Sequence, residues 1–379
     1  MTFRRFIAAA LMPAILLCCS GCLPHTELNK QAIVEAIGVD YSDEGYEVSV
    51  QYFNMEESGG STLVDSSKAN VVVVKGRGTD IQTAIESASV KCGQPFMFGI
   101  TAAIVFGEEA AKRDLVKSLS FAETYYQSNP KTLIAVAKGK ASDIMDVKFK
   151  DGVVSVEHLR QLMVHAEQLG LGETKPLYKV MNELRQPTGC TILPLLATAM
   201  TESGITDDGR IIELSGGVLL SERVLTDTIS LSDLSGLQFL RDKIINTSFS
   251  AVADGQNITV SLYNVKTKVE PKYGDKKLTF KVKINALGKY IESQLQDEGI
   301  PYSDIVEEQC ESWVKRRIEG AVSAAVNKYG TDPVGLCHRI MSDDLSEWLT
   351  VKENFSELLK TAEFSVECNV KIDRFGITH

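Results

Sequence analysis

Apolar residues recur at short, regular intervals along this chain, and the interval changes from one half to the other. Near the start, apolar residues come in close succession over Gln31–Asp40 and alternate with polar ones over Tyr46–Phe53. A polar Ser-Asp-Glu-Gly sequence separates the two runs. This pattern predicts a β-hairpin of two antiparallel strands. Residues 56–69 are polar and rich in Gly and Ser, and we expect a loop there.

Beyond residue 70, apolar runs typical of buried strands alternate with segments that have a helical apolar stripe. The predicted elements are a strand at Val71–Val74, a helix from Asp80 to Lys91 capped by Thr79, a strand at Ile100–Phe106, a helix at Glu108–Leu119, a strand at Thr132–Ala137 and a helix at Ser155–Leu169. Such alternation predicts a sheet with helices packed against it.

The second half is dominated by strict alternation of apolar and polar residues. Runs of this kind are Ile258–Leu262, Val265–Val269, Leu278–Ala286 and Phe364–Ile372, with a further strand at Ile211–Leu220, a turn at Pro271–Lys277 and a helix at Leu231–Ile245. Strands with one buried face are typical of an antiparallel sheet. The longest predicted helix, about Asp304–Lys328, carries a wide apolar stripe, and we expect it to pack across that sheet.

Length and composition predict more than one domain. A chain of 379 residues is too long for one hydrophobic core. Residues 172–209 are rich in Pro, Gly and Thr, and we interpret them as the connection between domains. The predicted fold class is α+β and multi-domain. An N-terminal α/β-type region over 22–200, of one or two subdomains, has a mixed sheet with helices. A C-terminal α+β domain over 205–379 has an antiparallel-rich sheet packed by one long helix.

The first 29 residues have the pattern of an exported protein. Arg4 and Arg5 precede an apolar run from Phe6 to Leu17, and Ser20-Gly21-Cys22 follows. A positive start, a short apolar segment and small residues at a cleavage site describe a secretory signal peptide, here residues 1–21. The apolar run is about a dozen residues, whereas spanning a bilayer takes roughly 20, which favours removal of the segment over a membrane helix.

The cysteine directly after Gly21 resembles the bacterial lipobox, in which cleavage precedes a cysteine whose thiol carries a diacylglycerol. Cys22 is therefore the predicted lipidation site, although Cys19 stands where lipoboxes usually have Leu. The alternatives are a plain signal peptide and an uncleaved anchor. Stable anchoring needs two acyl chains or their equivalent, and an acylated Cys22 would supply them.

The net charge and the cysteine content limit the kinds of partner and of cysteine site that we expect. The net charge is −10, and it becomes −12 when Arg4 and Arg5 leave with the signal, so we expect no affinity for nucleic acid or for an anionic lipid surface. Five cysteines remain after cleavage and acylation: Cys92, Cys190, Cys310, Cys337 and Cys368. They would permit a disulfide, but the spacing assigns no pairing, and no Cys-x-x-Cys sequence follows the signal.

Two local motifs resemble binding sites without completing one. Gly76-x-Gly78 precedes a predicted helix, but the third glycine of a dinucleotide fingerprint is missing, so a tight strand-to-helix turn explains both glycines. His158 and His165 are two helical turns apart, about 10 Å, which is too far for one metal ion. No Gly-x-Ser-x-Gly or His-Glu-x-x-His sequence occurs. We predict no catalytic residue, cofactor or metal site, although paired carboxylates would leave no such signature.

Several short stretches occur in an order that is similar to one family. They are Gly21-Cys22, Glu27-Leu28-Asn29, Gly38-Val39-Asp40, Phe98-Gly99-Ile100, Phe106-Gly107-Glu108-Glu109, Gly216-Gly217-Val218-Leu219-Leu220, Lys266–Pro271 and Gly330-Thr331-Asp332-Pro333-Val334-Gly335-Leu336. Together they resemble the Ger(x)C, or GerAC-like, lipoproteins, the C subunits of bacterial spore germinant receptors. The chain departs from the family pattern at Leu23, Pro24 and Ile100, where Trp, Asp and His are common.

The resemblance implies a non-enzymatic protein on the outer face of the inner spore membrane. Its partners would be the integral membrane A-type and B-type receptor subunits, with which it would detect nutrients and trigger germination. No catalytic residue and no cofactor is implied. Two other classes stay open. One is a solute-binding lipoprotein of a transporter, against which the antiparallel-rich C-terminal half counts. The other is an exported enzyme, against which the missing motifs count.

Overall fold

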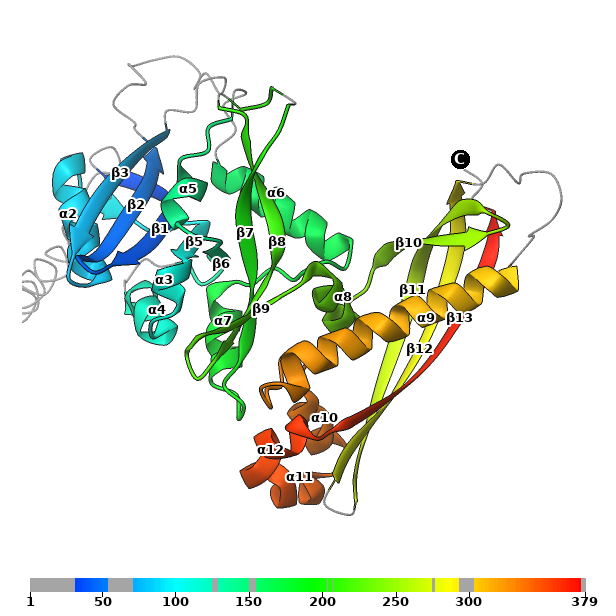
Figure 1. Ribbon diagram of the computed structural model, residues 1–379. Helices are drawn as coiled ribbons and strands as arrows, with labels where there is room; N and C mark the ends of the chain where they lie inside the picture. The colour runs from blue at the N-terminus through cyan, green and yellow to red at the C-terminus, as the bar shows by residue number, and fades with distance from the viewer. Residues whose placement is uncertain are drawn as a thin grey trace, which may run out of the picture.

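The protein is built from two β-sheets that are joined through helices, as the computed structural model in Figure 1 shows. The structure describes residues 31–53, 71–124, 129–149, 155–202, 204–206, 208–274, 277–292 and 303–375. The predicted signal at 1–21, Cys22 and the predicted loop at 56–69 lie outside the described residues.

The large sheet is mixed, as predicted. Its strands lie in the order β3 (Val71–Gly78), β2 (Gly45–Phe53), β1 (Ala32–Ser42), β5 (Ala103–Gly107), β6 (Leu133–Ala137), β7 (Thr191–Met200), β8 (Arg210–Ser221) and β9 (Val224–Ile229), with the short β4 (Phe96–Met97) beside the start of β1. The central strands β1, β5, β6 and β7 are parallel. The pairs at both sides are antiparallel, and they include the predicted hairpin of β1 and β2.

Helices cover both faces of this sheet. One core contains residues of α2 (Ile81–Cys92), α3 (Glu108–Ala111), α4 (Leu115–Thr124) and α7 (Leu177–Leu184). The core on the opposite face contains residues of α5 (Ala141–Met145) and α6 (Ser155–Gln168). Each strand of the centre is thus buried on both sides, which is the usual state of parallel strands.

Several predicted boundaries were wrong for local reasons. Asp80, not Thr79, caps α2, because its Oδ1 accepts the Thr83 N–H at 2.8 Å. The predicted helix at Glu108–Leu119 is two helices, because Asp114 interrupts it and its Oδ1 accepts the Lys117 N–H at the start of α4. The predicted strand at Ile100–Phe106 begins only at Ala103, because a turn precedes it in which the Thr101 N–H donates to Phe98 O.

Residues 172–209 do not form the predicted connection between domains. They contain α7 and β7, and the first seven residues of β7 are all buried. Because β7 is buried on both faces, its sequence lacks the alternation of apolar and polar residues by which a strand is recognised. The predicted division at 200–205 coincides with the turn between β7 and β8, so the large sheet continues across it.

The two glycines of Gly76-x-Gly78 are not in a turn but within strand β3. A Cβ atom at Gly76 would lie 2.1 Å from Ala84 O and 2.5 Å from Ala88 N. Both glycines therefore let the backbone of α2 pack directly on the strand. This close packing, and not the predicted strand-to-helix turn, explains why glycine stands at the two positions.

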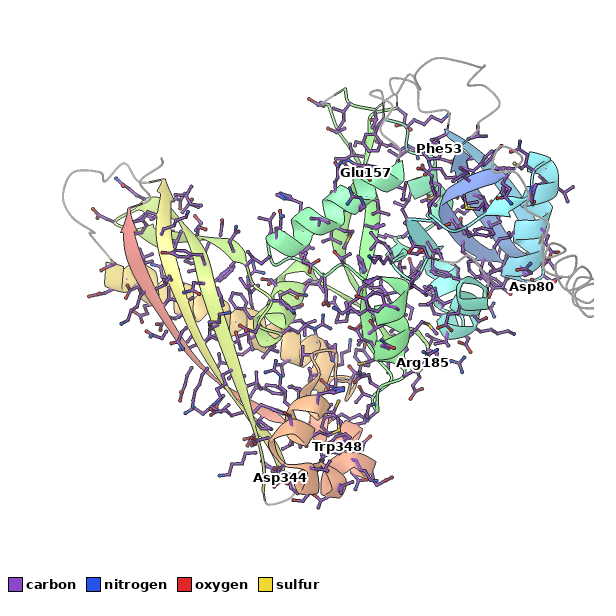
Figure 2. All side chains as sticks on the ribbon, turned by 180° about the vertical axis from the view of Figure 1, so that it is seen from behind. Phe53, Asp80, Glu157, Arg185, Asp344 and Trp348 are labelled. Carbon is purple, nitrogen blue, oxygen red and sulfur yellow. The ribbon has the colours of Figure 1, made fainter. Side chains whose placement is uncertain are left out.

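The small sheet has the order β10 (Asn246–Ala253), β11 (Gln256–Gly274), β12 (Lys277–Glu292) and β13 (Glu363–Phe375). The first two pairs are antiparallel, but β13 runs parallel to β12. The chain between them passes through α10 (Leu336–Asp343), α11 (Leu345–Val351) and α12 (Phe355–Lys360). Figure 2 shows Asp344 and Trp348 where these helices meet the end of the β11–β12 hairpin.

One long helix packs across the small sheet, as predicted. It consists of α9 (Ser303–Ala321), which continues into the π-helical turn η2 (Val322–Asn327). The buried residues of α9 are Val306, Cys310, Val314, Ile318 and Ala321. This stripe forms part of one core with the inner faces of β11 and β12.

Side chains of the same helix also bond to backbone groups at both edges of the small sheet. The side chain of Gln309 bonds to both backbone groups of Val252 on β10, at 3.0 and 2.7 Å. On the opposite edge, Glu311 and Glu307 accept the N–H groups of Val370 and Ile372 on β13. Backbone groups that would otherwise be free to pair with another strand are thus satisfied within the chain.

Helix α8 (Leu231–Leu240) joins the two sheets. Its residues share a core with Ile192 of β7 and Leu219 of β8 on one side and with α9 on the other. A Cβ atom at Gly236 would lie 2.0 Å from Arg317 O, so the backbones of α8 and α9 are in contact. The helix ends earlier than predicted, because Asp242 adopts a left-handed conformation with φ of 57°.

We predict that Gly76→Ala destabilises the protein by about 3 kcal/mol, because the added methyl group must separate α2 from β3. Urea unfolding followed by circular dichroism measures this. Gly274→Ala is the matched control, since a Cβ atom there meets nothing within 4 Å. Equal unfolding midpoints for the two variants would contradict the packing role of Gly76.

Candidate functional site

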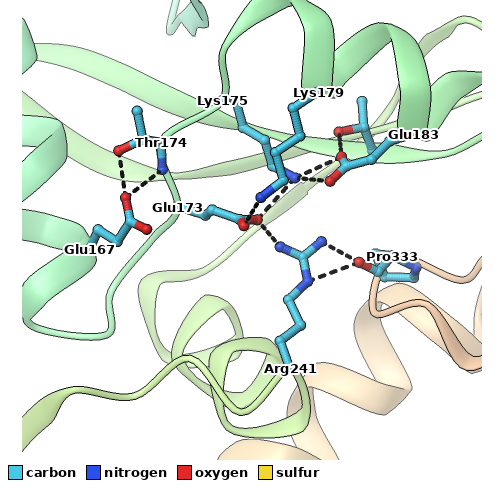
Figure 3. A network of polar contacts seen from close by, with 9 residues as sticks. Glu167, Glu173, Thr174, Lys175, Lys179, Glu183, Arg241 and Pro333 are labelled. Atoms are coloured by element: carbon cyan, nitrogen blue, oxygen red, sulfur yellow. Dashed lines mark hydrogen bonds and ion pairs between the residues drawn. The ribbon is translucent and has the colours of Figure 1, made fainter. Parts of the chain in front are cut away.

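The most unusual polar feature of the described residues is a cluster of charged side chains at the junction of the two sheets (Figure 3). It begins in the segment before α7. Lys175 is the largest buried charged residue, with a side chain that is 1% exposed. Its position is fixed because its carbonyl oxygen accepts the Ile134 N–H of β6.

Two carboxylates neutralise this buried lysine. Lys175 Nζ lies 3.0 Å from Glu173 Oε2 and 2.6 Å from Glu183 Oε1. Glu183 lies on α7 and also accepts the hydroxyl hydrogen of Thr191, the first residue of β7. Lys179, one helical turn before Glu183, forms a further ion pair with Glu173. Each charge in the group therefore has a partner of opposite sign, as burial demands.

Arg241 extends the cluster into the second half of the chain. It is the C-cap residue of α8, and its guanidinium pairs with Glu173. The same guanidinium donates from Nε to the carbonyl oxygen of Pro333 at 3.0 Å. One side chain thus ties the large sheet, α8 and the loop before α10 together.

The charge states follow from this geometry. Burial by itself would raise the pKa of Glu173, but the nearby cations Arg241, Lys175 and Lys179 together lower it below its usual value. Burial is the main reason why the pKa of Lys175 is lowered, and Arg241 adds to it. The carboxylate of Glu173 is therefore ionised at neutral pH and holds three cations around it.

A hollow of about 290 Å³ opens beside this cluster. Its lining includes Glu173, Lys179, Arg241, Lys243, Asp332 and His338. Asp332 accepts the N–H groups of Leu336 and Cys337 at the start of α10. Glu173, Lys179, Arg241 and Asp332 are thus engaged in ion pairs and hydrogen bonds that hold the fold.

A larger hollow of about 850 Å³ lies between the starts of α2 and α4. Its charged groups are also engaged nearby. Asp80 caps α2, Asp114 pairs with Arg223 at 2.9 Å, and Arg113 lies over the ring of Tyr41 at 4.1 Å.

The residues considered from the sequence are not brought together. His158 is half-buried with its ring 4.4 Å from that of Phe149, and burial lowers its pKa. His165 is exposed on the same helix. Within the described part of the chain, no group of three or more His, Cys, Asp or Glu residues could hold a metal ion.

The five cysteines expected in the mature chain are free thiols. Four of them are buried, namely Cys190, Cys310, Cys337 and Cys368. Burial raises the pKa of Cys190, Cys310 and Cys368 to about 12 in each case. These thiols are protonated at neutral pH and are therefore poor nucleophiles.

Sequence reasoning missed the charged cluster. Its local part carried a signal, because Lys175, Lys179 and Glu183 are spaced by four residues and Glu173 precedes them. The partners Arg241 and Pro333 are 68 and 92 residues from their contacts, at Glu173 and Arg241 respectively. Nothing in the local sequence indicates that Arg241 contacts Glu173 and Pro333.

Glu35 is a second carboxylate with an unusual environment. It lies at a bulge in β1, and its Oε2 is buried without a hydrogen-bond partner among the described residues. Burial raises its pKa to about 7, and the charge of Glu157 on α6 adds to the effect. Glu35 is thus ionised less readily than an ordinary glutamate near neutral pH.

Two family models match almost the whole chain. The model described as the spore germination protein N-terminal domain matches residues 24–198. The model described as spore germination B3/GerAC like, C-terminal, matches residues 215–376. The chain belongs to the GerAC-like family of spore germination proteins. This confirms the resemblance drawn from the sequence.

Relatives and a solved structure agree with this membership. The putative spore germination protein YfkR of Bacillus subtilis (strain 168) is 20% identical over 387 residues, which cover 99% of this chain and 98% of the relative. Spore germination protein KC of the same organism is 21% identical over 395 residues, which cover 99% and 97%. The crystal structure of the GerBC protein matches with a TM-score of 0.59 at 17% identity, covering 89% of this chain and 97% of that one. The α+β, multi-domain fold of this GerAC-like chain is thereby confirmed.

The GerAC-like chain shows no membrane-spanning helix in its described part, since none of those helices is both long and apolar enough to cross a bilayer.

We predict that Lys175→Met destabilises the protein by about 3 kcal/mol, because it removes a fully buried ammonium group and leaves the partly buried Glu183 carboxylate without its counter-charge. The free energy of unfolding in urea measures this. Lys277→Met is the control, since the Lys277–Glu363 pair is more than 60% exposed on both sides and should contribute less than about 1 kcal/mol. A similar, small effect of both variants would show that the buried cluster does not stabilise the fold.

We predict that Glu35→Gln makes the protein more resistant to heat at pH 8 than the wild type, with little difference near pH 4. The pKa of Glu35 is about 7 in the folded protein, above its value in the unfolded chain. The stability that protonated Glu35 contributes to the fold is therefore present in acid and is lost as the pH rises through 7, whereas Gln stays neutral throughout. Melting temperatures measured from pH 4 to 8 test this. A difference that does not change with pH would rule out the titration of Glu35 as its cause.

Proposed function

We propose that this chain is the lipid-anchored C subunit of a spore nutrient germinant receptor, and that it acts in assembly and signalling without catalysing a reaction. The observation that carries the proposal is the match of the two spore germination models to both halves of the chain. The relatives KC and YfkR, which are named as spore germination proteins, support it over nearly their full length.

The structure fits a role in assembly. The buried charges at the junction hold two sheets in a fixed relation, and the four buried thiols are unreactive. Side chains of α9 bond to backbone groups at both edges of the small sheet. These features support a body that presents surfaces to partners.

Cys22 is the proposed attachment to the membrane. A diacylglycerol on its thiol would confine the body to the outer face of the inner spore membrane. Confinement raises the effective concentration near integral subunits, as a short linker would. The proposed partners are therefore the A-type and B-type membrane subunits of the receptor.

We predict that Cys22→Ala releases the protein from sporulating-cell membranes into the supernatant, whereas Cys92→Ala stays in the membrane pellet. Cys92 is the matched control because it is a half-buried cysteine of the folded body. Membrane fractionation followed by immunoblotting gives the result. Retention of the Cys22→Ala protein in the pellet would overturn the proposed anchor.

A pull-down of the wild-type chain in mild detergent tests the partners. We expect two integral membrane proteins to co-elute, one of them similar to an amino-acid transporter. Recovery of a transporter permease with an ATPase would instead identify a solute-binding lipoprotein and overturn the proposed function.

A further inference from the structure

The end of the large sheet at which the chain enters β1 has exposed apolar residues and a charge composition that differ from those of the whole chain. We define this β1-entry end as residues 71–74, 89–102, 129–132 and 176–178. Hydrogen bonds join three of these segments, because Asn129 Nδ2 donates to Thr101 O and Tyr178 N–H donates to Pro130 O. Residues 71–74 lie at the same end of the sheet, since Val71 pairs with Phe53 of β2 and Phe53 pairs with Ile33 of β1.

Exposed apolar side chains gather at the β1-entry end. Val72 on β3 is 37% exposed and Val90 on α2 is 80% exposed. Ile100 in the loop before β5 and Tyr178 on α7 are 51% and 54% exposed. They come from four separate elements, so the apolar character belongs to the end of the sheet and not to one stretch of sequence.

The four described segments of this end differ in charge from the molecule as a whole. The chain has 50 acidic residues and a net charge of −10, yet the four segments contain no Asp or Glu. They contain two exposed cations, Lys91 and Lys131. Apolar and aromatic side chains beside lysines, without carboxylates, are the composition that suits the interface of an anionic bilayer.

The chain outside the described residues brings this end close to the proposed anchor. Ala32 follows Cys22 by ten residues, which span at most about 35 Å when fully extended. Ala32 itself contacts the β1-entry end, because its N–H donates to Pro95 O. An acyl chain on Cys22 would therefore hold this end, rather than the small sheet, nearest to the lipid.

We propose that the β1-entry end rests on the lipid surface, with Ile100 and Tyr178 in the interfacial layer and Lys91 and Lys131 near anionic headgroups. This inference rests on the proposed lipid anchor. It departs from the expectation that the acidic chain has no affinity for anionic lipid, because the four described segments carry two lysines and no carboxylate. The small sheet is then held away from the bilayer, where it is free to contact other subunits.

The test places a photo-cross-linking amino acid at one position of the full-length, lipid-processed chain in native membranes. Positions 100 and 178 probe the β1-entry end. Positions 349 on α11 and 291 on β12 are the matched controls, because Leu349 and Ile291 are 56% and 54% exposed. We expect lipid adducts from positions 100 and 178 to exceed those from the controls several-fold.

Two outcomes would overturn the proposal. Equal lipid adducts from all four positions, or adducts to another protein instead of lipid at 100 and 178, would exclude this end as the lipid contact while leaving the anchor intact. Absence of the wild-type chain from the membrane fraction would overturn the anchor, and this proposal with it. Fractionation of the same samples distinguishes the two failures.

Discussion

The ionised carboxylate of Glu173 is the point on which the relation between the two sheets depends. Three cations from separate elements, Lys175, Lys179 and Arg241, gather around it. A buried carboxylate is tolerated only when its charge is compensated, so the three must stay in place once the site is formed. Because Arg241 also holds Pro333, the position of α10 and the loop before it follows from the same contact.

Around Glu173, helices α8 and α9 connect the sheets, and α9 also contacts the edges of the small sheet. Helix α8 lies in one core with residues of β7, β8 and α9, and α9 bonds to edge backbone groups of the small sheet through Gln309 on one side and Glu307 and Glu311 on the other. The bonded backbone groups of Val252, Val370 and Ile372 are therefore not free to pair with an added strand.

A rigid body is what a membrane-associated assembly subunit requires. If one end is held at the lipid through Cys22, the fixed junction at Glu173 transmits that orientation to the small sheet. A surface on the small sheet would then keep a constant height and direction relative to integral subunits. A flexible linker between the two sheets would lose this geometry, and the structure has helix α8 and the Arg241–Glu173 ion pair in its place.

The sequence by itself determined those elements whose signal is local. The β1–β2 hairpin, the long helix α9 and the alternating strands of the small sheet follow from periodicity, which a strand or helix with one buried face must show. Strand β7 was missed because burial on both faces erases that periodicity. The parallel direction of β13, the packing of α2 on Gly76, and the closure of Arg241 on Glu173 were decided by tertiary structure alone. Each depends on segments far apart in the chain meeting at atomic distance, and no local pattern of residues encodes such a meeting.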